Sequence, residues 1–221
     1  MESIHGYSLE RPYISSFFRE ISPGWIDLGL AAKGIISPRD PDRECFRYLE
    51  LGSGMGVTLV FLAAMYPKAS FIGIDYSAIH VNKSEELARC AGIDNIRFIQ
   101  GDIAELSSSA IASHEGLDTE SFDYIVAQGL YTWVAPKVQD SILALASRLL
   151  KESGAFYCSY NCKPGWLPIY ILKHLVGLDD WDISNRKSID AYSDAVSFLQ
   201  IATGSTGFAT PIGVAQPGLR P

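Results

Sequence analysis

A glycine-rich turn is the first feature of this 221-residue sequence that could bind a ligand. It follows a short strand-like run and opens a helix-forming run, which is the context that such a turn needs. Glycines let the backbone turn tightly and let a ligand approach without a Cβ in the way. The start of the following helix adds free N–H groups. The segment is Glu50-Leu51-Gly52-Ser53-Gly54-Met55-Gly56.

Two carboxylates end the next two strand-like runs. Asp75 can accept hydrogen bonds from both hydroxyls of a ribose. The alternative is that Asp75 caps the helical segment that starts near Ser77. Asp102 follows Gly101 at the end of the third run, where the alternative to a ligand contact is a solvated turn residue.

The spacing of the glycines distinguishes between ligands. A dinucleotide-binding turn has the spacing G-x-G-x-x-G, which would place its third glycine at position 57. Position 57 is Val57, and the third glycine is Gly56. The spacing G-x-G-x-G after Glu50 resembles motif I of class I S-adenosyl-L-methionine-dependent methyltransferases. In that family the acidic residue helps to order the turn and its waters around the methionine part of the donor.

This resemblance implies roles for the other strand ends. Asp75 would bind the ribose, Asp102 the adenine amino group, and the next residue would pack on the adenine ring. The run from Phe122 to Gly129 resembles motif IV, whose end faces the transferred methyl group. The resemblance thus implies these donor-binding residues: Glu50, Gly52, Ser53, Gly54, Gly56, Asp75, Tyr76, Asp102, Ile103 and Gln128.

The elements that must position these residues alternate between strand and helix. This alternation predicts an α/β, Rossmann-like, doubly wound and mostly parallel sheet with helices on both faces. Right-handed crossovers place all strand C-termini at one edge, where ligands bind near the switch in strand order. Every motif falls at that edge. The expected strands are 47–51, 71–75, 96–100, 122–127 and 155–160, and the expected helices are 57–66, 77–90 and 136–149, with Gly154 just past the last helix.

Three further segments carry a narrower resemblance. They are residues 159–166 (Ser-Tyr-Asn-Cys-Lys-Pro-Gly-Trp), residues 129–134, and the stretch from Tyr7 to Tyr13. They resemble a bacterial group of methyltransferases whose catalytic domain is joined to a methyltransferase regulatory domain. Some members are protein-lysine methyltransferases. We expect the acceptor side to contain Tyr131, Trp133, Tyr160 and Asn161; the alternatives are core packing for the first two and shaping of a turn for the others.

The pattern divides the chain into three parts. Residues 1–43 are expected to form an N-terminal helical extension or a lid, with short helices over 14–21 and 25–32. Residues 44–202 are expected to form the methyltransferase domain, without a convincing antiparallel strand pair after residue 170. Two further helices are expected over 167–176 and 189–201. Residues 203–221 have the composition of a Gly- and Pro-rich tail or linker.

The amino-acid composition limits the classes of partner that the protein is expected to bind. The net charge of −7 and the pI near 5.1 argue against binding to nucleic acid or to an anionic membrane surface. The longest apolar run is too short to cross a bilayer. No cysteines or histidines have zinc-ligand spacing, and the four cysteines are expected to be reduced, which favours a cytoplasmic protein.

The expected reaction is methyl transfer from S-adenosyl-L-methionine to a small-molecule or protein acceptor. Methyl transfer from a sulfonium needs positioning more than proton transfer, and no histidine lies in a motif, so no general base is predicted. For the histidines we expect surface or packing roles. Two alternatives remain open: a non-catalytic module that binds the donor, and an NAD-dependent oxidoreductase.

Overall fold

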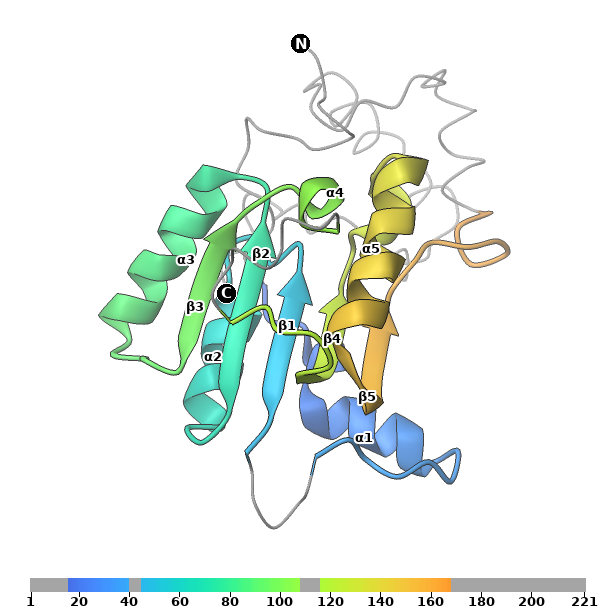
Figure 1. Cartoon of the computed structure of the whole chain (residues 1–221), viewed down its shortest axis with the longest axis horizontal. Coiled ribbons are helices and arrows are strands. Elements are labelled where there is room, and N and C mark those ends of the chain that lie inside the picture. The colour runs from blue at the N-terminus through green and yellow to red at the C-terminus, as the bar shows by residue number, and fades with distance from the viewer. Residues whose placement is uncertain (1–15, 40–44, 108–115, 168–221) are drawn as a thin grey trace, which may run out of the picture. The chain divides into compact units, whose positions relative to one another are not determined.

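The computed structural model describes residues 16–39, 45–107 and 116–167. Five parallel strands form one sheet in the order β3-β2-β1-β4-β5, so the strand order reverses between β1 and β4 (Figure 1). The strands are β1 (Arg47–Leu51), β2 (Ser70–Asp75), β3 (Ile96–Gln100), β4 (Phe122–Ala127) and β5 (Leu150–Cys158). The helices are η1 (Arg19–Ile21), α1 (Pro23–Ala31), α2 (Val57–Met65), α3 (Ala78–Cys90), α4 (Ile103–Leu106), η3 (Tyr131–Trp133) and α5 (Pro136–Leu149).

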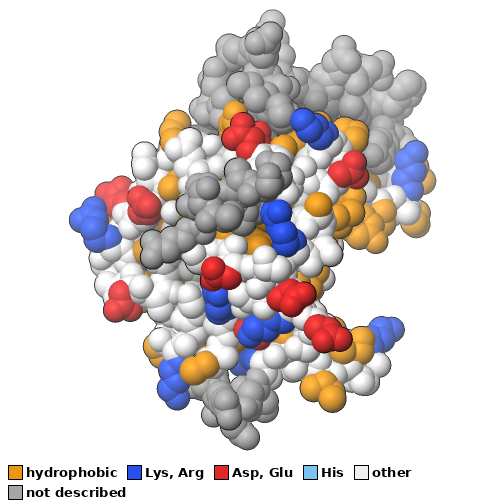
Figure 2. Space-filling model, in the orientation of Figure 1, with side chains coloured by type: hydrophobic (Ala, Val, Ile, Leu, Met, Phe, Trp, Pro, Cys, Tyr) orange, Lys and Arg blue, Asp and Glu red, His pale blue; other side chains and the backbone are white. Residues whose placement is uncertain are grey.

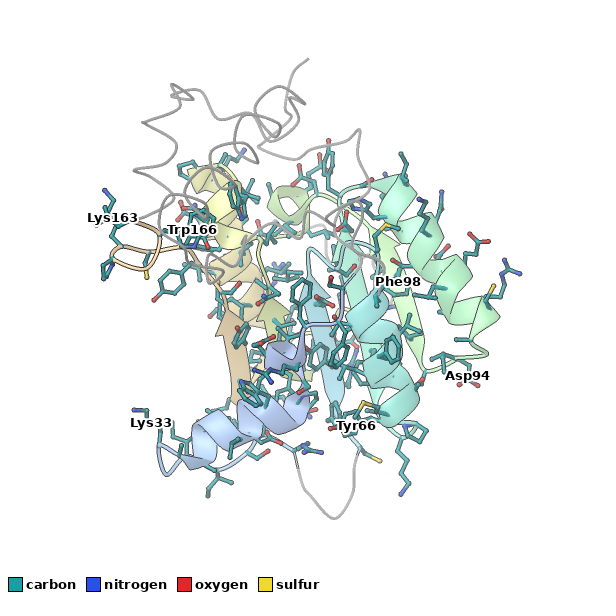
Figure 3. All side chains as sticks on the ribbon, turned by 180° about the vertical axis from the view of Figure 1, so that it is seen from behind. Lys33, Tyr66, Asp94, Phe98, Lys163 and Trp166 are labelled. Carbon is teal, nitrogen blue, oxygen red and sulfur yellow. The ribbon has the colours of Figure 1, made fainter. Side chains whose placement is uncertain are left out.

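Alternating side chains of the strands supply two hydrophobic cores, one on each face of the sheet. On β1, Leu49 and Leu51 point to the face covered by α4 and α5, whereas Tyr48 points to the face covered by α1, α2 and α3. Figure 1 shows α5 in front of the sheet, and Figure 3 shows the opposite face with α1 and α2 in front. The predicted doubly wound α/β fold is therefore confirmed, with every described strand parallel.

The segment before β1 packs on the second of these faces. Ile21 is fully buried and Ile26 is 9% exposed, and both belong to the core that contains Tyr48 and Tyr124. The hydroxyl of Tyr48 donates to the carbonyl of Ile21, and the hydroxyl of Tyr124 donates to Asp27. Residues 19–27 therefore complete the core. Helix α1 agrees with the helix expected over 25–32; of the one expected over 14–21, the described part contains only η1.

Asp123, in the run that resembles motif IV, ties three strands together near their beginnings. Its side chain is 8% exposed. One carboxylate oxygen accepts the N–H of Arg47 at 2.8 Å, and the other accepts Lys151 Nζ at 2.7 Å. Because Arg47 begins β1 and Lys151 lies early in β5, this one carboxylate links β4 to both of the strands beside it.

Replacing Asp123 by alanine should therefore lower the free energy of unfolding by about 2–3 kcal/mol. Most of this loss comes from the charge-assisted bond to the Arg47 N–H, since Lys151 is 41% exposed and its ion pair contributes less. Asp123→Asn keeps an acceptor for the backbone and should lose about 1 kcal/mol. Urea unfolding of the three proteins measures both differences; equal stability of the alanine variant and the wild type would contradict this role.

The prediction for the fifth strand is wrong at its start. Helix α5 passes directly into β5, because Leu150 already has extended backbone angles. Gly154 therefore lies inside the strand and does not end the helix. The pairing with β4 shifts at this point: Phe122 pairs with Leu150, but Tyr124 pairs with Ala155. The extra residues of β5 interrupt the regular pairing, and the apolar periodicity of the sequence does not show this shift of register.

The chain divides into two compact units, residues 1–160 and 161–221. All the described strands lie in the first unit. The described part of the second unit is residues 161–167. The expected helices over 167–176 and 189–201, the tail over 203–221 and the N-terminal stretch 7–13 lie outside the described residues, so the division at residues 43 and 202 stays a prediction. No helix in the described ranges is long and apolar enough to cross a membrane.

Candidate functional site

The glycine-rich turn lies at the C-terminal end of β1, next to the point where the strand order reverses. Gly52, Gly54 and Gly56 have φ angles of +75°, +54° and +67°, which other L-residues rarely adopt. A Cβ added to Gly52 would come within 3.1 Å of the Leu130 side chain. The turn after β1 and the loop after β4 are therefore in contact, and the absence of a side chain at position 52 permits it.

The N–H groups of this turn are mostly used inside the protein. Those of Gly52 and Ser53 both donate to the carbonyl of Ile74, at 2.8 and 3.0 Å. The N–H of Gly54 donates to Asp75 Oδ2 at 2.8 Å. A turn that binds a pyrophosphate needs such groups directed at the ligand. This arrangement favours a ligand without phosphates, which agrees with the spacing of the glycines.

Asp75 ends β2 and is the centre of a hydrogen-bond network. Its Oδ2 accepts from Gly54, and its Oδ1 accepts the N–H of Ser77 at 2.9 Å and lies 3.1 Å from His80 Nδ1. The bond to Ser77 shows that Asp75 does support the turn into α3. A carboxylate offers about four acceptor positions, so these bonds leave room for a further hydroxyl at Oδ2. Tyr76 follows in this turn and is half-buried.

Three buried polar atoms near the ends of β1 and β4 have no hydrogen-bond partner among the described residues: Glu50 Oε2, Ser53 Oγ and Gln128 Oε1. Buried polar groups are nearly always paired, so each unpaired one needs an explanation. All three come from segments that flank the switch in strand order. A bound polar ligand there would supply the missing partners, so these residues fit the donor predicted from the motifs.

Glu50 is the most unusual of the three. It is 5% exposed. Burial, followed by the negative charge of Asp75, raises the pKa of the Glu50 carboxyl to about 8. At neutral pH the side chain is therefore mostly protonated and can donate a hydrogen bond as well as accept one.

The third strand end supplies Asp102 and Ile103. Asp102 Oδ1 accepts the N–H of Ala104 at 2.8 Å and thereby caps α4. This is a structured cap, in contrast to the solvated turn considered as the alternative. Ile103 is only 2% exposed and belongs to the core under α4 and α5, which leaves little of its side chain for contact with adenine. The roles of both residues toward the donor stay predictions.

The residues expected on the acceptor side follow β4 and β5. Tyr131 and Trp133 lie in the short helix η3; Tyr131 packs partly against the core, and Trp133 is 38% exposed. Tyr160 is 65% exposed two residues past β5. The ends of the two strands are tied together, because the N–H of Gly129 donates to Ser159 Oγ at 2.7 Å. Asn161 belongs to the second unit.

His80 and Ser84 of α3 lie in no motif, yet they contact this site. His80 is within hydrogen-bond distance of Asp75, and Ser84 Oγ lies 3.1 Å from the Gly54 carbonyl oxygen. The sequence carries one signal for them: they are four residues apart on the helix after Asp75, so they share a face.

A family model described as a methyltransferase domain matches residues 43–192. The chain belongs to this family of methyltransferase domains. An uncharacterised protein of Synechocystis is 33% identical over 161 residues, which are 73% of this chain and 30% of that protein. An uncharacterised protein of Rickettsia prowazekii is 36% identical over 126 residues, which are 57% of this chain and 47% of that protein.

A solved structure agrees with this methyltransferase domain in fold and sequence. It is the structure of PKMT2 from Rickettsia typhi in complex with AdoHcy, with a TM-score of 0.69 and 28% sequence identity. The superposition covers 90% of this chain and 36% of the PKMT2 chain. The prediction that the chain is a class I S-adenosylmethionine-dependent methyltransferase domain is thus confirmed. The predicted methyl donor, S-adenosylmethionine, is confirmed with it. This methyltransferase domain spans less than half the length of these relatives.

Proposed function

We propose that this domain binds S-adenosyl-L-methionine at the C-terminal ends of β1, β2 and β3 and transfers its methyl group to a small-molecule or protein acceptor. The observation that carries the proposal is the cluster of unpaired buried atoms beside the glycine-rich turn, at the switch in strand order. The sulfonium of the donor supplies both the methyl group and its leaving group. The protein's residues therefore have to bind, orient and exclude water.

Each strand end has its own part in this proposal. Asp75 Oδ2 accepts from a ribose hydroxyl, and Asp102 accepts from the adenine amino group. Glu50 and Gln128 flank the methionine part of the donor, where their unpaired oxygens gain partners. Tyr131 and Trp133 follow β4, where an aromatic ring face would stabilise a nearby cation.

An acidic chain favours a small-molecule or protein acceptor over a nucleic acid, because its net charge of −7 repels phosphates. On the face in Figure 2, Lys and Arg side chains are interspersed with Asp and Glu. The cytoplasmic location and the reduced state of the cysteines, both inferred from the sequence, stay predictions.

The proposal predicts tighter binding of S-adenosylhomocysteine than of NAD. The Gly52, Ser53 and Gly54 N–H groups already donate within the protein, so the phosphates of NAD would have to break those bonds. Calorimetry with each ligand measures the difference. Tighter binding of NAD would overturn the proposal, and donor binding without turnover on any acceptor would favour a non-catalytic module.

Replacing Asp75 by alanine should weaken binding of S-adenosylhomocysteine at least about tenfold. A hydrogen bond to a charged acceptor contributes roughly 1.5–3 kcal/mol, and a factor of ten corresponds to about 1.4 kcal/mol. Asp75→Asn keeps one acceptor oxygen and should lose less affinity. Calorimetry on variants with a normal thermal melt tests the assignment; an alanine variant that binds as well as the wild type would show that the ribose lies elsewhere.

Replacing Tyr131 by alanine should lower the rate of methyl transfer more than it lowers donor affinity, because positioning of the acceptor acts on the transition state. Tyr131→Phe keeps the ring face and should retain most of the rate. Single-turnover transfer and donor affinity are measured separately. If the alanine variant loses donor affinity and keeps its transfer rate, Tyr131 belongs to the donor pocket.

A further inference from the structure

One face of α3 contacts the glycine-rich turn through two buried polar side chains. His80 is 7% exposed and Ser84 is fully buried. They lie one helical turn apart, so both side chains project from the same side of the helix. The N-cap residue of α3 is Ser77, whose N–H donates to Asp75, so Asp75 also contacts the start of this helix.

His80 restrains the carboxylate of Asp75. Its Nδ1 lies 3.1 Å from Asp75 Oδ1, and the Asp75 side chain is 12% exposed. The other oxygen of Asp75 accepts from the Gly54 N–H at 2.8 Å. Oδ1 also accepts the Ser77 N–H at 2.9 Å, so each oxygen already has one backbone donor. The imidazole adds a second contact to Oδ1 and further restrains the plane of the carboxylate, and with it the direction of the remaining acceptor position of Oδ2.

Ser84 restrains the peptide on the other side of the same glycine. Its hydroxyl lies 3.1 Å from the Gly54 carbonyl oxygen and 2.9 Å from the His80 carbonyl oxygen, so one hydrogen lies between two acceptors. Together with Asp75, this shared contact gives both the N–H and the C=O of Gly54 a partner, the C=O sharing its donor with the His80 carbonyl. A glycine with a φ of +54° has little intrinsic preference for that angle, so these bonds hold the turn in shape.

We propose that His80 and Ser84 are positioning residues, which act through Asp75 and Gly54 to preorganise the donor-binding turn. This inference rests on the proposed function, because it assumes that the donor binds at Asp75. Preorganisation strengthens binding by removing the entropy that the free protein would otherwise lose when the side chain and the turn become ordered. The alternative is that the imidazole competes with the ribose for Oδ1. In that case, removal of the imidazole will tighten donor binding.

The test compares His80→Leu with His80→Asn. Leucine removes the donor group, whereas the amide of asparagine places an N–H close to the position of Nδ1. We expect S-adenosylhomocysteine to bind about threefold to tenfold more weakly to the leucine variant, and the asparagine variant to recover most of that affinity. In turnover, KM for the donor should rise while kcat changes little, since the acceptor side is untouched.

Ser84→Ala is a smaller change that keeps the test decisive if the leucine variant does not fold. It should weaken donor binding about twofold to fivefold while the thermal melt shows a folded protein. Unchanged or tighter binding of the donor by the folded leucine variant, or by Ser84→Ala in its place, would overturn the inference. No binding of S-adenosylhomocysteine to the wild type would instead overturn the proposed function, so the two failures are distinguishable.

Discussion

Replacing Gly56 by alanine is expected to lower the free energy of unfolding by about 2–5 kcal/mol. Two causes add up here. The φ of +67° disfavours any residue with a Cβ, by roughly 1–2 kcal/mol. The new Cβ would also lie 2.6 Å from Ser84 Oγ and 2.8 Å from the ring of Phe98, which is labelled in Figure 3. Overpacking of this kind costs about 1–3 kcal/mol.

Gly92 provides a matched control for this substitution. It has nearly the same angle, φ +68°, but nothing lies within 4 Å of where its Cβ would be. Gly92→Ala should therefore lose only the backbone part, about 1–2 kcal/mol. Urea unfolding of both variants separates the backbone effect from the clash. Equal losses in the two variants would mean that α3 and β3 move away from the turn without penalty.

Replacing Glu50 by glutamine is expected to remove the fall in stability of the ligand-free protein that Glu50 causes between pH 4.5 and 8. In the unfolded chain Glu50 ionises near its usual pKa of 4.5, whereas in the folded protein burial and Asp75 raise the pKa to about 8. Between these values the folded protein binds more protons than the unfolded chain. Its stability therefore falls as the pH rises through this window.

The size of this fall follows from the shift. One pKa unit corresponds to about 1.4 kcal/mol, so wild type should lose on the order of 2–4 kcal/mol between pH 4.5 and 8 because of Glu50. Glu50→Gln lacks the ionisation and should exceed wild type by a similar amount at pH 8, while near pH 4 the two should agree. Urea unfolding across this range measures both, with exposed Glu86→Gln as the control. Parallel curves for Glu50→Gln and wild type would exclude the raised pKa.

The first four strands, and α2 and α3 between the first three of them, can be predicted from the sequence because each is bounded by turn residues; α4, a single turn after Asp102, is not predicted. The fifth strand cannot be predicted in the same way, since no turn separates α5 from β5 and Gly154 has the appearance of a helix stop. The periodicity of apolar residues indicates which single residues are buried, whereas a shift of register depends on the pairing with the neighbouring strand.

The sequence predicts that Glu50, Asp75 and Gln128 lie at the C-terminal edge of the sheet, but it does not predict their hydrogen-bond partners. The place of Asp75 at the end of a strand-like run predicts a ligand contact, yet its contacts with Gly54 and His80 depend on how the glycine-rich turn and α3 pack. The motif that contains Asp123 does not indicate its bonds to β1 and β5. Such contacts join residues far apart in the chain, so spacing along the sequence cannot show them.

The hydrogen bond between Asp27 and Tyr124 also has a consequence for how the protein is made. These residues are 97 positions apart, and Ile21 beside them is fully buried against the same core. At a synthesis rate of roughly 5–20 residues per second, the early segment waits about 5–20 s after leaving the ribosome before β4 emerges. During that interval Tyr48 of β1 is available to Ile21, but Tyr124 of β4 is still missing from this core. Completion of this core is therefore a late event in the folding of the nascent chain.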